Sequence, residues 1–401
     1  MLSHSPVSIY DTAVSGLCRI FDHWADFDVG GDLDVFLKQV PPRWVVYLFA
    51  DAADRPIQLL CVKNLRYSLK RRLGSDPTVG PSKRINYREL VRRIYWRPVD
   101  SGFEADFAYL EVARLLFPQT YQGMLGFRPA WFIHVDPDAM YPQYTKTKDL
   151  SSGRGIYIGP FEDKHVAARL IELTEDCFDL CRYYRILLQA PRGKACAYKE
   201  MGRCPAPCDG SMPMEEYRRR IAASAKAIVD PSDYLIQEKM RMDEASAALR
   251  FEAAARIKSR IEQAGQFRQG PFRHARRLED SAFLSVQRGP RAGTAKLFLI
   301  VRGEIEEIAG LIGQPGAWSE LTHYVLACAT ERAGVDVTAA GVERMGLVAS
   351  HLFTRKQAGG VFVGLEAVAE RSLAAAFREV SREKQVEEIE GEGVVRELGA
   401  M

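Results

Sequence analysis

The stretch CAYKEMGRCPAPCDG at positions 196–210 holds three cysteines within thirteen residues, among prolines and glycines that favour tight turns. A fourth cysteine lies upstream, and the four candidate ligands, with 14, 7 and 3 residues between them, are Cys181, Cys196, Cys204 and Cys208. Four thiols spaced in this way can surround one tetrahedral metal ion or an iron–sulfur centre. Cys177 is a second candidate for the first ligand, because spacing alone does not distinguish it from Cys181.

Composition limits the class of protein. The 401 residues are 47% hydrophobic and 27% charged, which is typical of a soluble chain of two or three domains. We find no apolar run near eighteen residues and no secretory signal, so we expect no membrane contact and a cytoplasmic location. In a reducing compartment, clustered cysteines favour metal binding over disulfides. Soft thiolates suit iron–sulfur or zinc equally well.

Positive charge is concentrated in one part of the chain, although the net charge is only +3. Residues 63–97 contain eleven Lys and Arg against Asp76 and Glu89, interleaved with tyrosines and a tryptophan. Such a segment predicts contact with nucleic acid, and the alternative is a solvated helix face. The candidate DNA-binding residues are Lys63, Arg66, Lys70, Arg71 and Arg72.

The hydrophobic patterns predict an α+β protein. Residues 44–50 and 57–62 indicate two strands of a hairpin, followed by a basic helix at 65–73 and a third strand at 94–96. Further helices are predicted at 104–116, 165–179, 214–229 and 318–332, and from about 365 to 388, with two more between 234 and 264. Strands are predicted at 156–161, 282–286 and 295–303.

The N-terminal order of strands and helices resembles the GIY-YIG nuclease domain found in the bacterial excinuclease subunit UvrC and its shorter relative Cho. Val45-Val46-Tyr47 matches the first motif of that family, and Lys63-Asn64-Leu65-Arg66 matches part of the second. Glu111 falls at the position of the metal-binding glutamate. The resemblance implies Tyr47, Arg66 and Glu111 as candidate catalytic residues, with Glu111 holding Mg²⁺ or Mn²⁺ if the nuclease is active.

Several family positions carry other residues here. The second tyrosine of the motif falls on Gln58, the lysine on Cys61, the catalytic arginine on Ser68 and the asparagine on Gly123. Phosphodiester cleavage needs a positioned hydroxyl, a cation for phosphate charge and a carboxylate-held metal. Catalytic groups act as a unit, so we expect a scaffold whose incision activity is weakened or lost.

The cysteine stretch also resembles this family. Gly202-Arg203-Cys204-Pro205-Ala206-Pro207-Cys208-Asp209-Gly210 is close to the family signature Gly-Arg-Cys-x-Ala-Pro-Cys-x-Gly. In UvrC-type proteins, four cysteines at these positions are associated with a 4Fe–4S cluster. The resemblance therefore implies this cluster on Cys181, Cys196, Cys204 and Cys208, with zinc as the alternative.

A helical segment downstream resembles the UVR motif, a hairpin through which UvrB and UvrC contact each other. Phe251-Glu252-Ala253-Ala254-Ala255 is similar to its core, although any amphipathic helix pair could carry so short a match. The implied contact residues for a UvrB-like helicase partner are Phe251, Glu252, Ala254 and Ala255. The RNase H-like nuclease of full UvrC is not found in this sequence.

The sequence thus predicts five segments: an N-terminal helical segment (1–40), a degenerate GIY-YIG-like domain (41–127), a cysteine-cluster segment (128–230), a UVR-like hairpin (231–266) and a C-terminal αβ region (281–401). The expected function is a UvrC/Cho-like role in nucleotide excision repair, binding DNA and a UvrB-like partner, with the 3′-side incision weakened or lost. The alternatives are an active metal-dependent endonuclease that makes one nick and an iron–sulfur DNA-binding regulator.

Overall fold

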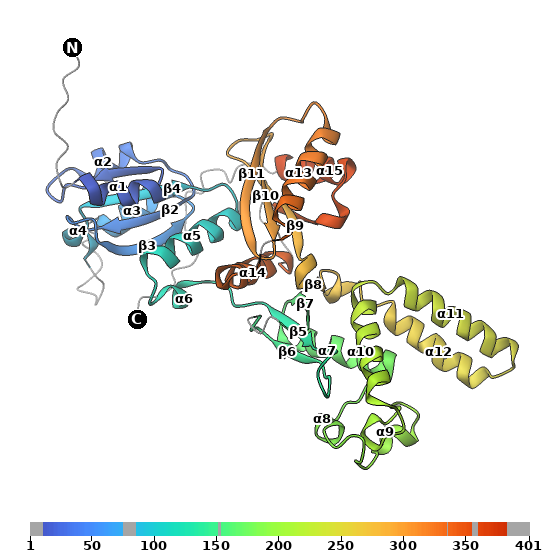
Figure 1. Cartoon of the computed structure of the whole chain (residues 1–401). Coiled ribbons are helices and arrows are strands. Elements are labelled where there is room, and N and C mark those ends of the chain that lie inside the picture. The colour runs from blue at the N-terminus through green and yellow to red at the C-terminus, as the bar shows by residue number, and fades with distance from the viewer. Residues whose placement is uncertain (1–10, 75–85, 151–153, 335, 355–359, 383–401) are drawn as a thin grey trace.

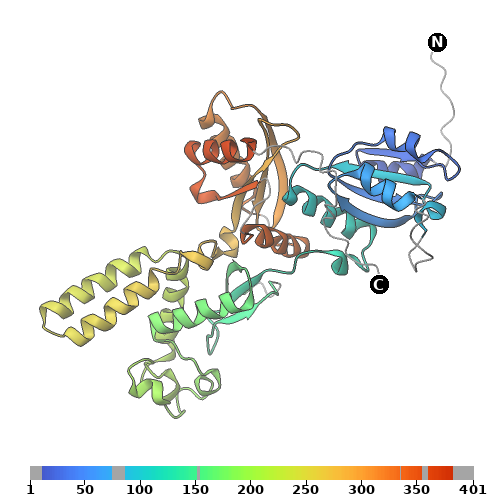
Figure 2. The ribbon, with the colours of Figure 1, turned by 180° about the vertical axis from the view of Figure 1, so that it is seen from behind.

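The computed structural model describes residues 11–74, 86–150, 154–334, 336–354 and 360–382. Helices are combined with three antiparallel four-stranded sheets, which confirms the predicted α+β class. The sheets lie in separate parts of the molecule, and a helical hairpin projects to one side (Figure 1). The same arrangement is seen from behind in Figure 2.

The N-terminal sheet has the order β1-β4-β2-β3. Its central strand β2 (Val45–Ala50) is buried along its whole length because helices cover both faces. Alternate side chains therefore enter two cores. Tyr47 and Phe49 face one core, and Val46 and Leu48 face the other. The elements are α1 (Asp11–Ile20), β1 (His23–Asp26), α2 (Leu33–Gln39), β2, β3 (Pro56–Val62), α3 (Leu65–Leu73), α4 (Tyr87–Leu90), β4 (Arg93–Pro98), α5 (Gly102–Leu116) and α6 (Tyr121–Met124).

The middle sheet, of order β6-β5-β7-β8, packs against two long helices that enclose one core. Cys181 and Cys204 belong to this core, so the cysteine segment is continuous with it. The elements are β5 (Trp131–Val135), β6 (Thr145–Thr147), β7 (Ile156–Phe161), α7 (Lys164–Phe178), α8 (Tyr184–Leu187), α9 (Ala197–Glu200), α10 (Met214–Val229) and β8 (Arg276–Arg277). The projecting hairpin consists of α11 (Ser232–Ala247) and α12 (Phe251–Ala264).

The C-terminal sheet has the order β11-β10-β9-β12, and all of its pairs are antiparallel. Two helices, α13 and α15, cover one face. The other face packs against α14 and against α5 of the N-terminal domain, where Phe103 and Leu110 enter the shared core. The elements are β9 (Ala282–Arg288), β10 (Thr294–Val301), β11 (Glu304–Ile312), α13 (Trp318–Arg332), α14 (Ala339–Leu352), β12 (Gly360–Gly364) and α15 (Glu370–Arg382).

Two expectations need correction. Segment 1–40 is not helical throughout, because His23–Asp26 forms the edge strand β1 against β4. Cross-strand pairs hold this strand: the His23 ring stacks 5.8 Å from Trp96, and Asp26 pairs with Arg93 at 2.7 Å. These contacts lie 67 residues or more apart in the chain, and four residues are too short for a clear strand pattern.

The second correction concerns the C-terminal quarter, where the predicted elements were the helices at 318–332 and at about 365–388. Strand β12 completes the sheet, and α14 is a further helix. Glycines weaken both patterns. Gly346 is nevertheless needed within α14, since a side-chain carbon there would lie 2.7 Å from the carbonyl oxygen of Arg128. Helix α14 therefore packs in close contact with the backbone at Arg128, just before the middle domain. The predicted extension to residue 388 runs beyond the described residues.

Candidate nuclease-like site and cysteine centre

Tyr47, the tyrosine of the first nuclease-like motif, is completely buried in the core beneath α2 and α3. Its hydroxyl bonds to the hydroxyl of Ser68 at 2.9 Å. Ser68 occupies the family position of the catalytic arginine. Burial raises the pKa of Tyr47 to about 12, since the phenolate loses its hydration there. The phenol is therefore a neutral core group that solvent does not reach.

The other replaced positions are also packed into the domain. The side-chain oxygen of Gln58 is buried and has no hydrogen-bond partner. The thiol of Cys61 accepts a hydrogen bond from the Trp44 indole at 3.4 Å, and burial raises its pKa to about 12. Neither group supplies the positive charge that a phosphate would require at this place.

Glu111, the candidate metal ligand, lies on α5, which packs on the opposite face of the sheet from Tyr47. Its two carboxylate oxygens each accept a hydrogen bond of 2.9 Å from Arg344 of α14. Arg114 adds a third bond of 2.9 Å, and Arg344 also pairs with Glu304 of β11. Bidentate pairs of this kind are strong and geometrically specific. Glu111 thus joins the N-terminal domain to the C-terminal sheet.

Further polar contacts extend this interdomain contact along α5. His351 of α14 lies 2.9 Å from Asp106, and Tyr121 donates to Glu343 at 2.5 Å. Lys296 of β10 pairs with Asp100 at 2.9 Å just ahead of the helix. The C-terminal sheet therefore covers the side of α5 that carries Glu111.

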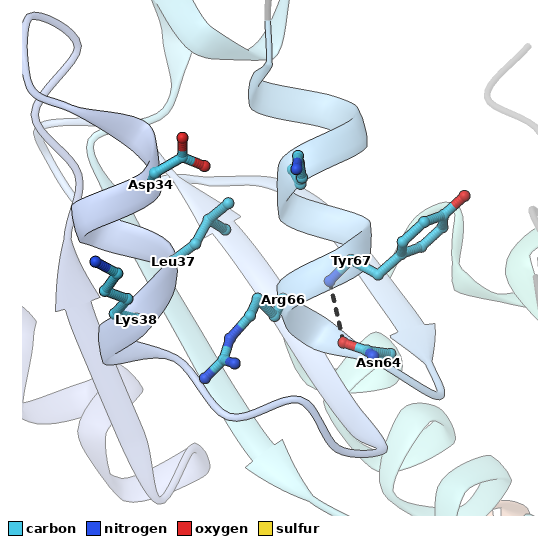
Figure 3. A pocket seen from close by; sticks show the side chains of 7 residues that line it. Asp34, Leu37, Lys38, Asn64, Arg66 and Tyr67 are labelled. Atoms are coloured by element: carbon cyan, nitrogen blue, oxygen red, sulfur yellow. Dashed lines mark hydrogen bonds between the residues drawn. The ribbon is translucent and has the colours of Figure 1, made fainter. Parts of the chain in front are cut away.

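The basic segment forms a groove between α2 and α3 of about 400 Å³ (Figure 3). Arg66 is tied to the end of α2, since its guanidinium donates to the Val40 carbonyl at 3.0 and 3.2 Å. The ring of Tyr67 is 45% exposed beside it. The full lining is Asp34, Leu37, Lys38, Asn64, Arg66, Tyr67 and Lys70.

The remaining candidate DNA-binding residues lie along the same helix or just before it. Lys70 and Arg71 are exposed, whereas Arg72 lies over the Tyr87 ring at 5.9 Å. Lys63 lies over the Trp44 ring, also at 5.9 Å. The helix thus presents several cations on one side of the domain, with Arg66 held by protein contacts.

Three of the four candidate cysteine ligands come together. The thiol of Cys181 donates to the Tyr183 carbonyl at 3.6 Å. The neighbouring Cys204 raises the pKa of Cys181, with a smaller electrostatic effect from Cys208, and Cys181 in turn lowers the pKa of Cys204. Burial raises the pKa of Cys208. The backbone N–H of Cys181 also donates to the Tyr217 hydroxyl at 3.1 Å, which fixes the first cysteine to α10.

Cys177 points elsewhere. Its thiol lies 3.9 Å from the carbonyl of Arg260 and 3.9 Å from the Gln263 side chain, both on α12. Cys204 acts on the pKa of Cys181, whereas the thiol of Cys177 faces α12.

Cys196 begins α9 on a neighbouring turn and is half-buried. This turn is tied to the other cysteines, because Gly193 donates to the Cys208 carbonyl at 2.8 Å and Lys199 pairs with Asp209 at 2.6 Å. Across the described ranges, no three His, Cys, Asp or Glu side chains are arranged to hold a metal ion. The thiol donors suit a soft centre, but their four side chains do not form a coordination set.

The hairpin is anchored at its base and exposed at its tip. Tyr234 donates to the Cys177 carbonyl at 2.9 Å, and Arg260 pairs with Asp179 at 2.6 Å. Near the tip, Phe251 is 64% and Leu249 74% exposed. Of the other predicted contact residues, Glu252 and Ala255 are exposed and Ala254 is half-buried.

Sequence reasoning missed Arg344 and Glu304, the partners around Glu111. Arg344 lies 233 residues from Glu111, in a helix that was not predicted. No local pattern marks either residue. The residues around Glu111 in the sequence do not indicate which distant cation will pair with its carboxylate.

Comparison with known proteins gives a family match. Residues 130–227 match the family model described as the UvrC/Cho excinuclease, middle domain. UvrABC system protein C of Wolinella succinogenes is 23% identical over 270 residues, covering 66% of this chain and 44% of the relative. The proteins of the same name from Lachnospira eligens and Trichormus variabilis are 24% and 26% identical, covering 68% and 57% of this chain and 45% and 36% of their own lengths. No solved structure matches the chain.

The chain is similar to UvrC and Cho proteins, as the family match over residues 130–227 and the UvrC relatives support. It spans less than half the length of these curated relatives. Within the part of the chain that the structure describes, no helix is both long and apolar enough to cross a membrane.

Proposed function

We propose that this chain acts in nucleotide excision repair as a UvrC/Cho-like protein that binds DNA and a UvrB-like partner, and that its GIY-YIG-like domain has lost the 3′-side incision. The observation that carries the proposal is the separation of the motif residues. Tyr47 is buried in one core and bonded to the Ser68 hydroxyl. Glu111 accepts hydrogen bonds from Arg344 on the other side of the sheet.

These contacts explain why we propose that phosphodiester cleavage is lost. Activating water next to a phosphate would require Tyr47 to reach solvent, but it is fully buried and its raised pKa keeps it protonated. A divalent ion at Glu111 would have to displace a bidentate guanidinium. Catalytic groups that work as a unit lose most of their effect once one is gone.

DNA contact is proposed at the groove between α2 and α3. Exposed Lys38 and Lys70 flank it, and Tyr67 offers an exposed ring. Cations that neutralise phosphates release counterions, so binding there should weaken steeply with salt. The paired substitution Lys38→Gln/Lys70→Gln should reduce both the affinity for duplex DNA and its dependence on salt.

Partner contact is proposed at the hairpin tip. Phe251 and Leu249 are large apolar residues exposed at the end of a projecting element, which is typical of a helical docking surface. The base of the hairpin is fixed by Tyr234 and Arg260, so the tip is presented in a defined position.

The cysteine segment is proposed to hold a 4Fe–4S cluster, with zinc as the alternative. Support comes from the position of Cys181 and Cys204 in one core and from the hydrogen bond between Gly193 and the Cys208 carbonyl, which joins the turn before Cys196 to the turn that carries Cys208. A bound centre would stabilise this loop-rich segment, because its helices are only four residues long. Iron, sulfide and zinc analysis of purified protein distinguishes the two centres.

The experiment that tests the function combines the protein with the UvrB of the same organism and a damaged duplex, in Mg²⁺ or Mn²⁺. We expect a complex of both proteins with the DNA and no nick on the 3′ side of the lesion. The substitution Phe251→Ala should weaken the complex. A nick that disappears in Glu111→Ala would establish the alternative, an active metal-dependent endonuclease.

A further inference from the structure

The cysteine segment also carries an exposed surface that the proposed function does not use. Its short helices α8 and α9 lie at the end of the middle domain, away from the hairpin and from the N- and C-terminal sheets (Figures 1 and 2). Two neighbouring aromatic side chains are open to solvent there: Tyr183 is 49% and Tyr184 39% exposed. Neighbouring exposed tyrosines are uncommon on a surface that contacts only water.

Positive charge surrounds these rings. Residues 181–204 include six Lys and Arg and a single acid, Glu200. Two of the six are paired, Arg182 with Asp176 and Lys199 with Asp209. The other four are exposed, and none of them pairs with a carboxylate in the described ranges; they are Arg185, Arg192, Lys194 and Arg203.

The rings and cations are held together by short contacts. The Tyr183 ring lies 5.7 Å from the Tyr198 ring, and the Arg182 guanidinium lies 4.8 Å over the latter. The backbone N–H of Arg203 donates to the Tyr198 carbonyl at 2.9 Å. The ring and guanidinium contacts link the start of α8 to α9, so these two short helices are held side by side.

We propose that this tyrosine–arginine face, formed by Tyr183, Tyr184, Arg185, Arg192, Lys194 and Arg203, binds single-stranded DNA. Exposed aromatic rings stack on unpaired bases, and flanking cations contact the phosphates. In a duplex the bases are already stacked on each other, so the tyrosines favour a single strand. The proposal rests on the DNA-binding part of the proposed function, but not on the groove between α2 and α3.

The test measures binding of a fluorescent oligothymidine and of a duplex of equal length to the full chain over a range of salt concentrations. We expect Tyr184→Ala to weaken single-strand binding about tenfold, since stacking on one aromatic is lost. Arg185→Gln/Lys194→Gln should also weaken it, and should lower the slope of log affinity against log salt by about 1.4, the value for two phosphate contacts on a single strand. Duplex binding should change little in both variants.

The matched control is Arg371→Gln/Arg378→Gln, which removes two exposed cations from α15 and should leave both affinities as in the wild type. Circular dichroism verifies that each variant is folded.

Unchanged single-strand binding in the face variants overturns the proposal, and so does an equal loss on single strand and duplex. A loss of binding to UvrB alone would show that the face is a protein contact instead. Absence of all DNA binding by the wild type would refute the proposed function itself, which separates the two failures.

Discussion

Tyr47 and Glu111, the motif residues of the N-terminal domain, lie on opposite faces of one sheet, whereas Cys181 and Cys204, 23 positions apart in the sequence, lie in the same core. Tyr47 is a buried core residue, and Glu111 forms an interdomain contact with Arg344. Cys181 and Cys204 lie near exposed cations that pair with no carboxylate in the described ranges. Within one chain, then, the residues of one family motif lie on opposite faces of a sheet, whereas two residues of another lie in the same core.

The largest expected effect concerns the cysteines. Cys204→Ser should abolish the iron and sulfide content of the purified protein, because it removes a central member of the thiol set. Cys177→Ser is the matched control and should retain both, since its thiol faces α12. Loss of iron in the Cys177 variant would contradict the assignment of Cys181 as the first ligand.

Tyr47 provides the next test. Replacing it with alanine removes a fully buried aromatic side chain, so the free energy of unfolding should fall by about 3–5 kcal/mol. Tyr47→Phe loses only the bond to Ser68 and should cost about 1 kcal/mol. Urea denaturation of both variants gives these values. A near-neutral Tyr47→Ala would show that the ring is not the core residue described above.

Arg344 tests the contact that engages Glu111. Arg344→Met should lower the free energy of unfolding by about 2 kcal/mol, since two charge-assisted hydrogen bonds between domains are lost. Arg114→Met removes a single bond within α5 and should have a smaller effect. Combining Arg344→Met with Glu111→Gln in a double-mutant cycle isolates the pair, and a coupling energy near zero would argue against the interdomain role.

A smaller effect is expected from Glu175 on α7, six residues before Cys181. Burial raises the pKa of Glu175 from its ordinary value of 4.5 to about 7. The folded protein then binds this proton more tightly than the unfolded chain, so stability should fall as the pH rises from 4.5 to 7 and level off above it. Glu175→Gln should reduce this decline. Thermal unfolding between pH 4.5 and 8 provides the comparison, and an unchanged profile would refute it.

The sequence predicted these two regions unequally, for physical reasons. The cysteine set is local, and its tight turns leave a signature of Cys, Pro and Gly that can be read directly. The choice between Cys177 and Cys181 depended on which way a helix ends: Asp179 adopts a left-handed conformation, with φ of 50°, just before Cys181. Cys177 therefore lies on α7, and Cys181 lies in the chain that turns away after it.

Strands β2, β3 and β4 of the N-terminal sheet were predictable from their apolar runs, whereas the short edge strand β1 was not. The environment of Glu111 was not, since it depends on a cation brought from α14 by tertiary packing. Strand β12 and helix α14 were missed for a related reason: their glycines allow close packing but weaken the local pattern.

The most direct test of the central claim is metal-dependent nicking of supercoiled plasmid by the purified chain. Rates are measured over a range of Mn²⁺ concentrations for the wild type, Glu111→Ala and Tyr47→Phe. With Tyr47 buried and Glu111 paired to Arg344, all three should show the same background rate at every metal concentration. A wild-type rate that rises with Mn²⁺ and falls to background in both variants would contradict the loss of the nuclease reaction.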